Sequence, residues 1–152
     1  MFLEYLKTNI QSNELEKLYF SSNIKDTYHI NINSNLQKFE YANNQQISSA
    51  NILAPCNTIP VDCFGNCNSL KYVNLNNSIS VLEHEAFEYC TNLEKISLPE
   101  NVLSIGYDCF YNCKNLNSII FNDKLKIIDS GAFDCCQQLT HLSISNNILS
   151  IN

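Results

Sequence analysis

Residues 93–113 read LEKISLPENVLSIGYDCFYNC, and this stretch decides the fold because its apolar positions recur along the chain. Phe110 follows Phe87 by a 23-residue step, and the same step leads to phenylalanine on either side of that pair, at positions 64 and 133. We call a set of equivalent positions, one from each repeat, a column. Six further columns are apolar and keep the 23-residue step: Cys67, Cys90, Cys113 and Cys136; Leu70, Leu93, Leu116 and Leu139; Val73, Ile96, Ile119 and Leu142; Leu75, Leu98, Phe121 and Ile144; Ile79, Val102, Leu125 and Ile148; and Leu82, Ile105, Ile128 and Ile151. Seven columns in one register predict a repeat protein whose units stack as successive coils.

Each unit contains a short segment of alternating polarity that predicts a β-strand. Val73 and Leu75 are apolar, whereas Tyr72 and Asn74 carry polar groups and point to the opposite side of an extended chain. One short strand per unit, repeated in register, predicts a parallel sheet that grows by one strand with every coil.

The segment before each phenylalanine predicts a different local structure. Asp62, Glu85 and Asp108 come just before the Ala/Cys-Phe pair, and acidic residues suit the first turn of a helix. We therefore expect one short helical or 3₁₀ turn per coil on the convex side. Together with the strands, this predicts an α/β solenoid.

The quoted stretch resembles the BspA-like class of leucine-rich repeats, which has about 23 residues per unit. Residues 93–99 and 105–113 carry the match to a pattern close to L-x-x-I-x-L-P-x-x-V-x-x-I-G-x-x-A/C-F-x-x-C. The match is strong over residues 59–152, although Gly106 is the only glycine in its column. The resemblance implies a leucine-rich-repeat solenoid, and proteins of this class are typically binding or adhesion proteins, often at cell surfaces.

Residues 1–58 are interpreted as degenerate repeats that precede four regular repeats in residues 59–152. Residues 15–24 and 36–41 keep the strand spacing, Ile30 takes the phenylalanine column, and the register is lost between residues 41 and 59. Because no Gly/Ser-rich linker interrupts the chain, we expect one continuous solenoid. Residues 2–10 fit a short capping helix, for which a frayed terminus is the alternative.

Composition excludes several classes of function. The chain has 152 residues and a formal net charge of −6, and its nine basic residues are all lysine. Because an acidic chain without arginine lacks the usual means of recognising phosphates and bases, we expect no nucleic-acid partner. No apolar stretch is long enough to span a membrane. The N-terminus does not read as a signal peptide, which favours a cytoplasmic location, while the resemblance also allows the cell surface.

Cysteine and histidine residues can bind metals or act in catalysis, but the repeat explains most of the cysteines as core residues. Cys63 and Cys109 share a column with alanine, so that column needs a small buried side chain rather than a zinc ligand. Cys56 and Cys135 lie outside the columns and are the expected exposed thiols. The three histidines have no partner at a recurrent spacing and no catalytic motif occurs, so we predict no enzyme activity, no metal and no cofactor.

The outward strand positions are the candidate binding residues. They form two columns on the concave face of the sheet, and they vary in type while the core columns are nearly uniform. The candidate protein-binding face comprises Lys17, Lys38, Tyr72, Asn74, Lys95, Ser97, Ser118, Ile120, His141 and Ser143. This mixture favours a polar protein partner over a small molecule, which would need a pocket.

Three hypotheses for the function follow. The first is a non-enzymatic protein–protein interaction module, with a link to adhesion that the resemblance implies. The second is an intracellular scaffold or targeting subunit, and the third is a metal- or thiol-dependent enzyme.

The C-terminal coil lacks a polar cap in the sequence. Residues 139–145 are expected to form a last strand with an open edge above an apolar cross-section. Either the chain is a fragment of a longer protein or two such ends abut, and both alternatives predict self-association, weakened by a charge at Ile144 or a lysine at Ser143.

Overall fold

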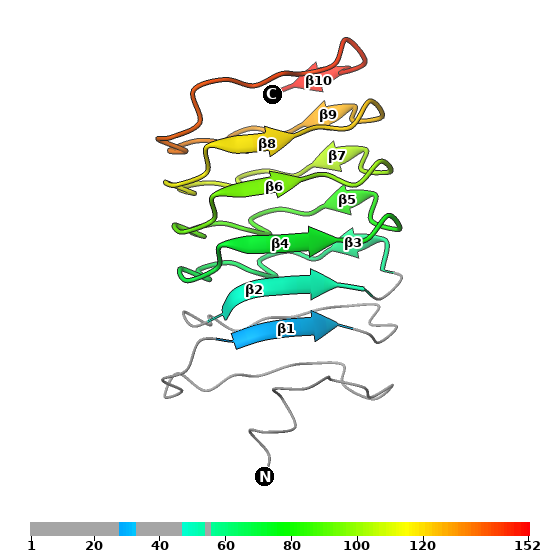
Figure 1. Cartoon of the computed structure of the whole chain (residues 1–152). Helices are drawn as coiled ribbons and strands as arrows, with labels where there is room; N and C mark the ends of the chain where they lie inside the picture. Colours follow the sequence, from blue (N-terminus) through cyan, green and yellow to red (C-terminus); the bar gives the residue numbers. More distant parts are fainter. Residues whose placement is uncertain (1–27, 33–46, 54–55) are drawn as a thin grey trace.

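The computed structural model describes residues 28–32, 47–53 and 56–152, which form a stack of similar coils (Figure 1). Its strands are β1 (Tyr28–Ile32), β2 (Ile47–Ile52), β3 (Thr58–Ile59), β4 (Tyr72–Leu75), β5 (Val81–Leu82), β6 (Lys95–Ser97), β7 (Ser104–Ile105), β8 (Ser118–Ile120), β9 (Ile127–Ile128) and β10 (Ser150–Ile151). Predictions made for Lys17, Lys38 and the candidate capping helix lie outside the described residues.

Two parallel strand systems run along opposite sides of the stack, which confirms the predicted solenoid. The longer strands pair as β1-β2-β4 and β6-β8, and the two-residue strands pair in the order β10-β9-β7-β5-β3. The register keeps the 23-residue step, since Lys95 pairs with Ser118 and Val81 with Ser104. Each regular coil thus carries two strands, not the single strand predicted, because the apolar pair that closes the repeat also runs extended.

The expected helical turns are not found, since no helix occurs in the described ranges, and therefore none that could cross a bilayer. Consecutive β-turns replace them. Asp62, Glu85 and Asp108 adopt left-handed φ angles of 55°, 58° and 50°, and Gly131 takes the same place in the last coil. Aspartate tolerates this conformation better than most residues, so the acidic column reflects turn geometry more than a helix start.

The backbone of these turns is divided between two sets of hydrogen bonds. The amides of Cys63 and Gly65 donate within their own coil, to the carbonyl oxygens of Pro60 and Asp62. The intervening amide of Phe64 donates to the carbonyl of Ala86 in the next coil, at 2.8 Å. In a helix, all these amides would donate hydrogen bonds within the same coil. Turns form instead because every second amide donates to a carbonyl of the next coil.

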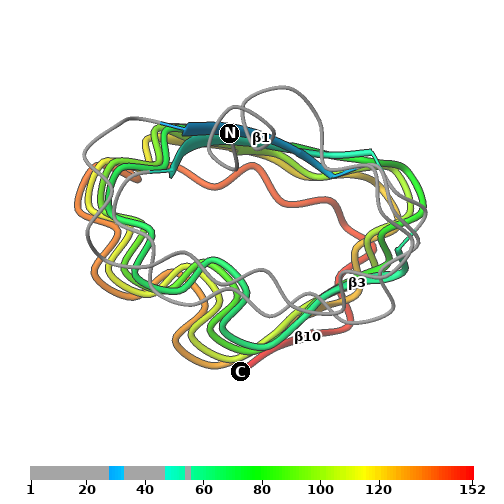
Figure 2. The same ribbon diagram turned by 90° about the horizontal axis from the view of Figure 1, so that it is seen from below.

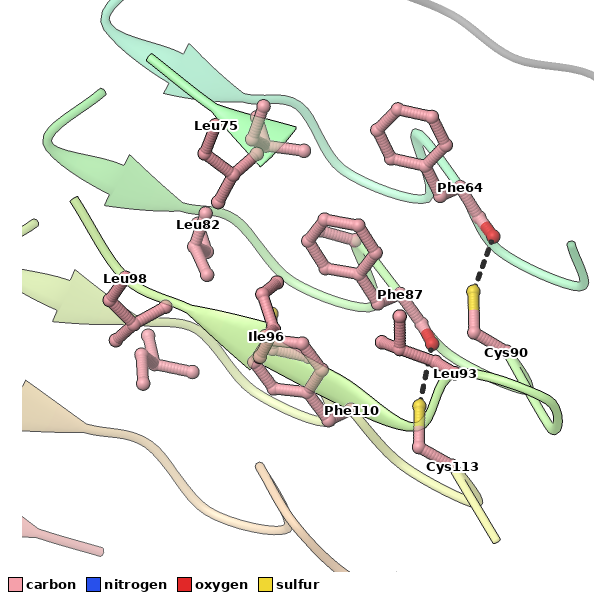
Figure 3. Close-up of a cluster of buried hydrophobic side chains, with 14 of the residues drawn as sticks. Phe64, Leu75, Leu82, Phe87, Cys90, Leu93, Ile96, Leu98, Phe110 and Cys113 are labelled. Carbon is pink, nitrogen blue, oxygen red and sulfur yellow. Dashed lines mark hydrogen bonds between the residues drawn. The ribbon is translucent and has the colours of Figure 1, made fainter. Parts of the chain in front are cut away.

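The core is a stack of identical layers. Phe64, Phe87 and Phe110 are fully buried, and consecutive rings lie nearly parallel with centroids 5.2 Å apart (Figure 3). The thiols of Cys90 and Cys113 donate to the carbonyl oxygens of Phe64 and Phe87, at 3.1 and 3.2 Å. The cysteine column therefore packs as a small apolar group that also satisfies a buried carbonyl.

The regular register begins earlier than predicted. Ala50 pairs with Val73 and Ile52 with Leu75, so the 23-residue step runs through the region where we expected it to be lost. Ile30 pairs with Ala50 and stands in a strand column, not in the phenylalanine column. Small residues concealed this register, because alanine stands where the regular repeats have valine or isoleucine.

Cys56 also belongs to the repeat, contrary to our prediction. It lies one repeat step before Ile79, in the column that continues with Val102, and it packs half-buried against the core. Its place was concealed in the same way, because a cysteine replaces a larger aliphatic side chain.

The last coil departs from the others, and residues 139–145 form no strand. Seen along the stack, this orange-red segment runs inside the outline of the preceding coils (Figure 2). Leu139, Ile144 and Ile148 pack half-buried against the core, whereas Leu142 is 40% exposed. The predicted open strand is therefore wrong, and the chain partly covers its own end.

Replacement of Phe110 by alanine should be strongly destabilising. The ring is fully buried between Phe87 and Phe133, so its loss removes buried apolar area and leaves a cavity between two coils. We expect the free energy of unfolding to fall by about 3–5 kcal/mol, measured by urea denaturation.

Lys95→Ala is the control for that change. Lys95 is exposed on β6, so its truncation should alter the free energy of unfolding by no more than about 0.5 kcal/mol. Coincident denaturation midpoints for the two variants would refute the assignment of core and surface columns.

Candidate functional site

The outward side chains of β4, β6 and β8 form one exposed surface, which we call the sheet face. It consists of Tyr72, Asn74, Lys95, Ser97, Ser118 and Ile120, all of which are exposed. Pairing of Lys95 with Ser118 and of Ser97 with Ile120 aligns these residues in two columns across the strands. Lys95 is the only charged side chain among the six, and two large groups, Tyr72 and Ile120, are 49% and 61% exposed.

Two further candidates are not on this sheet. His141 and Ser143 are exposed, but they lie in the segment of the last coil that forms no strand. Within the described ranges, no backbone hydrogen bond joins residues 140–147 to β8. The hydroxyl of Thr140 lies 2.9 Å from Nδ1 of His141.

The sheet contains face positions that sequence reasoning missed. Ser49 and Asn51 of β2 pair with Tyr72 and Asn74, which places them in the same two columns. The signal that could have found the β2 positions was the spacing of Ile47, Ala50 and Ile52, which repeats that of the core residues 70, 73 and 75.

Charge is segregated around the coils. The turn segments, residues 60–67, 83–90, 106–113 and 129–136, contain no lysine. They carry Asp62, Glu83, Glu85, Glu88, Asp108, Asp129 and Asp134, and we call this side the acidic edge. Burial, followed by repulsion from Glu85, raises the pKa of Asp62, and the pKa of Glu88 is raised by the same two effects. The acidic edge thus carries uncompensated repulsion, whereas the sheet face carries almost no charge.

The cysteines offer little nucleophilic chemistry. All eight have free thiols, six of them buried. Burial raises the pKa of Cys63, Cys90 and Cys113 far above the usual value, and it raises the pKa of Cys136 to about 11. A raised pKa keeps the thiol protonated at neutral pH, and the thiolate is the reactive form. Only Cys135 is exposed.

No arrangement of side chains in the described part of the chain suggests a metal centre. There, no group of three or more His, Cys, Asp or Glu residues is placed to hold an ion. His84 has a structural contact, since its Nδ1 accepts a hydrogen bond of 3.0 Å from the backbone amide of Tyr107 in the next coil.

Comparison with known proteins gives consistent results. A family model described as the BspA type leucine-rich repeat region matches in six copies, over residues 3–71 and 34–152. A leucine-rich repeat protein from Bacteroides ovatus is 26% identical with a TM-score of 0.66, over 81% of this chain and 35% of that one. The leucine-rich repeat protein of T. pallidum is 23% identical with a TM-score of 0.63, over 81% of this chain and 56% of that one. The chain therefore spans about a third and just over half of these two proteins. A search of functionally curated proteins found no match.

Asp62→Asn should stabilise the protein at neutral pH. Because the pKa of Asp62 is raised on folding, the folded chain binds a proton more readily than the unfolded chain, and stability rises as the pH falls. Asparagine removes the charge and tolerates the left-handed φ, as Asn66 does in the same turn. We expect a gain of less than about 1 kcal/mol at pH 7 and a smaller gain on acidification, measured by urea denaturation at pH 5 and 7. A lower stability at pH 7 would contradict the repulsion described for the acidic edge.

Thiol titration should distinguish Cys135 from the other seven cysteines. At pH 8 a thiol with a pKa near 11, as for Cys136, is ionised in about one molecule in a thousand. We therefore expect one fast reaction with a disulfide reagent in the native protein and seven more only after denaturation. Cys135→Ser should abolish the fast phase. A fast phase that persists in this variant would show that another thiol is accessible.

Proposed function

The chain belongs to the BspA-type leucine-rich repeat family, and from this premise we propose that it is a non-enzymatic module that binds a protein partner through its sheet face. The observation that carries the proposal is the contrast between buried and exposed columns. Core columns keep apolar side chains, as Val73, Ile96 and Ile119 do, whereas the neighbouring exposed column of the same strands reads Tyr72, Lys95 and Ser118. The fold requires apolar side chains in the core columns but leaves the residue type free in the exposed column, so the exposed residues can be selected to recognise a partner.

The composition of the sheet face suits a protein surface. Protein interfaces combine a few large anchors with a polar rim, and tyrosine is enriched at their energetic centres. Tyr72 and Ile120 supply two exposed anchors, and Ser97, Ser118 and Asn74 supply hydrogen-bonding groups around them. Because the carboxylates gather on the acidic edge, the sheet face can approach a partner without bringing like charges together.

The raised thiol pKa values weigh against the thiol-dependent enzyme among our hypotheses, since such an enzyme needs a thiolate at neutral pH. A role in adhesion and a role as an intracellular scaffold both use a binding face. The choice between adhesion and an intracellular scaffold depends on the partner. Capture experiments with host matrix proteins and with a lysate of the source cell would identify that partner.

The test compares two tyrosines of nearly equal exposure. Tyr72, on the sheet face, is 49% exposed, and Tyr107, on the acidic edge, is 47% exposed. With a captured partner, we expect Tyr72→Ala and Ile120→Ala each to weaken binding by about 1–2 kcal/mol, or five- to thirtyfold in Kd, measured by biolayer interferometry. Tyr107→Ala should leave Kd unchanged.

Equal binding by the parent chain, Tyr72→Ala and Ile120→Ala would show that the partner binds elsewhere. Loss of binding with Tyr107→Ala alone would move the interface to the acidic edge. Thermal unfolding of each variant controls for stability, and all three side chains are exposed enough to be truncated without opening the core.

A further inference from the structure

The segments around the start of β4, β6 and β8 are cationic, although the chain as a whole is acidic. Lys71, Lys95 and Lys114 are exposed there, and Glu94 is the only carboxylate of these segments, which comprise residues 68–74, 91–97 and 114–120. Three positive charges against one negative charge give them a net charge of +2, compared with −6 for the whole chain. An anionic group therefore meets attraction here and repulsion at the acidic edge.

Lys95 is the cation that lies within the sheet face itself. β4, β6 and β8 lie one above another, so the middle strand places Lys95 between Tyr72 and Ser118 (Figure 1). Among the described residues, the ammonium group of Lys95 has no hydrogen-bond or ion-pair partner, whereas that of Lys124 donates to Oδ1 of Asn101 at 2.7 Å. A partner that covers the sheet face therefore removes water from an unpaired charge.

This unpaired charge restricts the chemistry of the partner. Burial of an ammonium group without a counter-charge is strongly unfavourable, and lysine is depleted at the centres of protein interfaces. A carboxylate on the partner can offset the lost hydration of Lys95 with a charge-assisted hydrogen bond. The sheet face thus discriminates against partners that have no acidic side chain at this point.

Two large exposed side chains lie on either side of Lys95. Tyr72 is one repeat step away in the same column, with about 5 Å between the Cα atoms, and Ile120 lies diagonally across on β8, about 8 Å away. In an extended peptide, alternate residues point to the same side at intervals of about 7 Å. Three alternate residues of such a peptide can therefore lie over Tyr72, Lys95 and Ile120.

We propose that the partner binds the sheet face through an extended segment that reads apolar–x–acidic–x–apolar. Its acidic side chain pairs with Lys95, and its two apolar side chains cover Tyr72 and Ile120. The acidic edge repels the same segment, which directs it to the sheet face. This inference rests on the proposed function, because it names the chemistry of the partner that the sheet face recognises.

The experiment is selection of linear peptides from a displayed random library on the folded 152-residue chain. We expect the selected peptides to be enriched in Asp or Glu, with an apolar residue two positions away on each side. Lys95→Met removes the charge and keeps the length of the side chain, so it should weaken binding of these peptides about tenfold in Kd, measured by biolayer interferometry. Replacement of the acidic residue by its amide in the peptide should have the same effect, and both changes together should weaken binding little more than either alone.

Lys124→Met is the matched control. It changes the net charge by the same amount, and Lys124 is exposed in the loop between β8 and β9. Its Kd for the selected peptides should equal that of the parent chain. Lys95→Glu should reverse the preference and select peptides with Lys or Arg at the central position. Circular dichroism establishes that each variant is folded before its binding is interpreted.

Peptides that lose affinity with Tyr72→Ala but bind Lys95→Met as tightly as the parent chain would overturn this inference and leave the proposed function intact. Peptides that bind independently of Tyr72 and Ile120 would contradict the proposed function as well. Additive effects of Lys95→Met and of the amide in the peptide would show that the acidic residue contacts another group, and would overturn the pairing. A library that yields no binder would overturn the extended segment alone, because a folded partner could still bind the sheet face.

Discussion

The contact between successive coils is the constraint on which the rest of the structure depends. No coil is complete alone: the amide of Phe64 donates to the carbonyl of Ala86 in the next coil, and the carbonyl of Phe64 accepts from the Cys90 thiol. The Phe87 ring lies between the rings of Phe64 and Phe110. An insertion in one coil would break all of these contacts together, so the 23-residue step is kept from residue 50 to the end of the stack.

The same constraint explains which parts of the fold were predictable from the sequence. Large apolar side chains that recur at one spacing identify the core without further information, and the buried phenylalanine column was predicted for that reason. The turns were misinterpreted because Asp62 and Glu85 suit two structures, a helix start and a left-handed turn residue. The choice between them depends on amides that bond to the next coil, and these bonds are not visible in a single repeat. Ala50 and Cys56 concealed the earlier register because small side chains weaken a pattern based on hydrophobic size.

The candidate site was predictable only where the coil is regular. Alternation within a strand is local, so Tyr72, Lys95 and Ile120 were placed on the exposed side correctly. His141 and Ser143 share their columns but not their sheet, because residues 139–145 form no strand. Asparagine side chains also join neighbouring coils: the side-chain amides of Asn92 and Asn101 donate to the backbone carbonyls of Asn68 and Asn77. Such contacts depend on the spacing of coils and are not encoded by residue type.

Surface chemistry follows from the way the coils stack. Because equivalent residues lie one above another, any preference at one position of the repeat is multiplied into a stripe along the molecule. The left-handed turn position carries Asp62, Glu85 and Asp108, which are three of the seven carboxylates of the acidic edge. Burial and neighbouring carboxylates there raise the pKa of Glu88. The strand positions have no such preference and stay nearly uncharged. The turns therefore carry an acidic edge and the strands a nearly neutral face, and this separation leaves the sheet face as the surface on which a partner meets the least electrostatic cost.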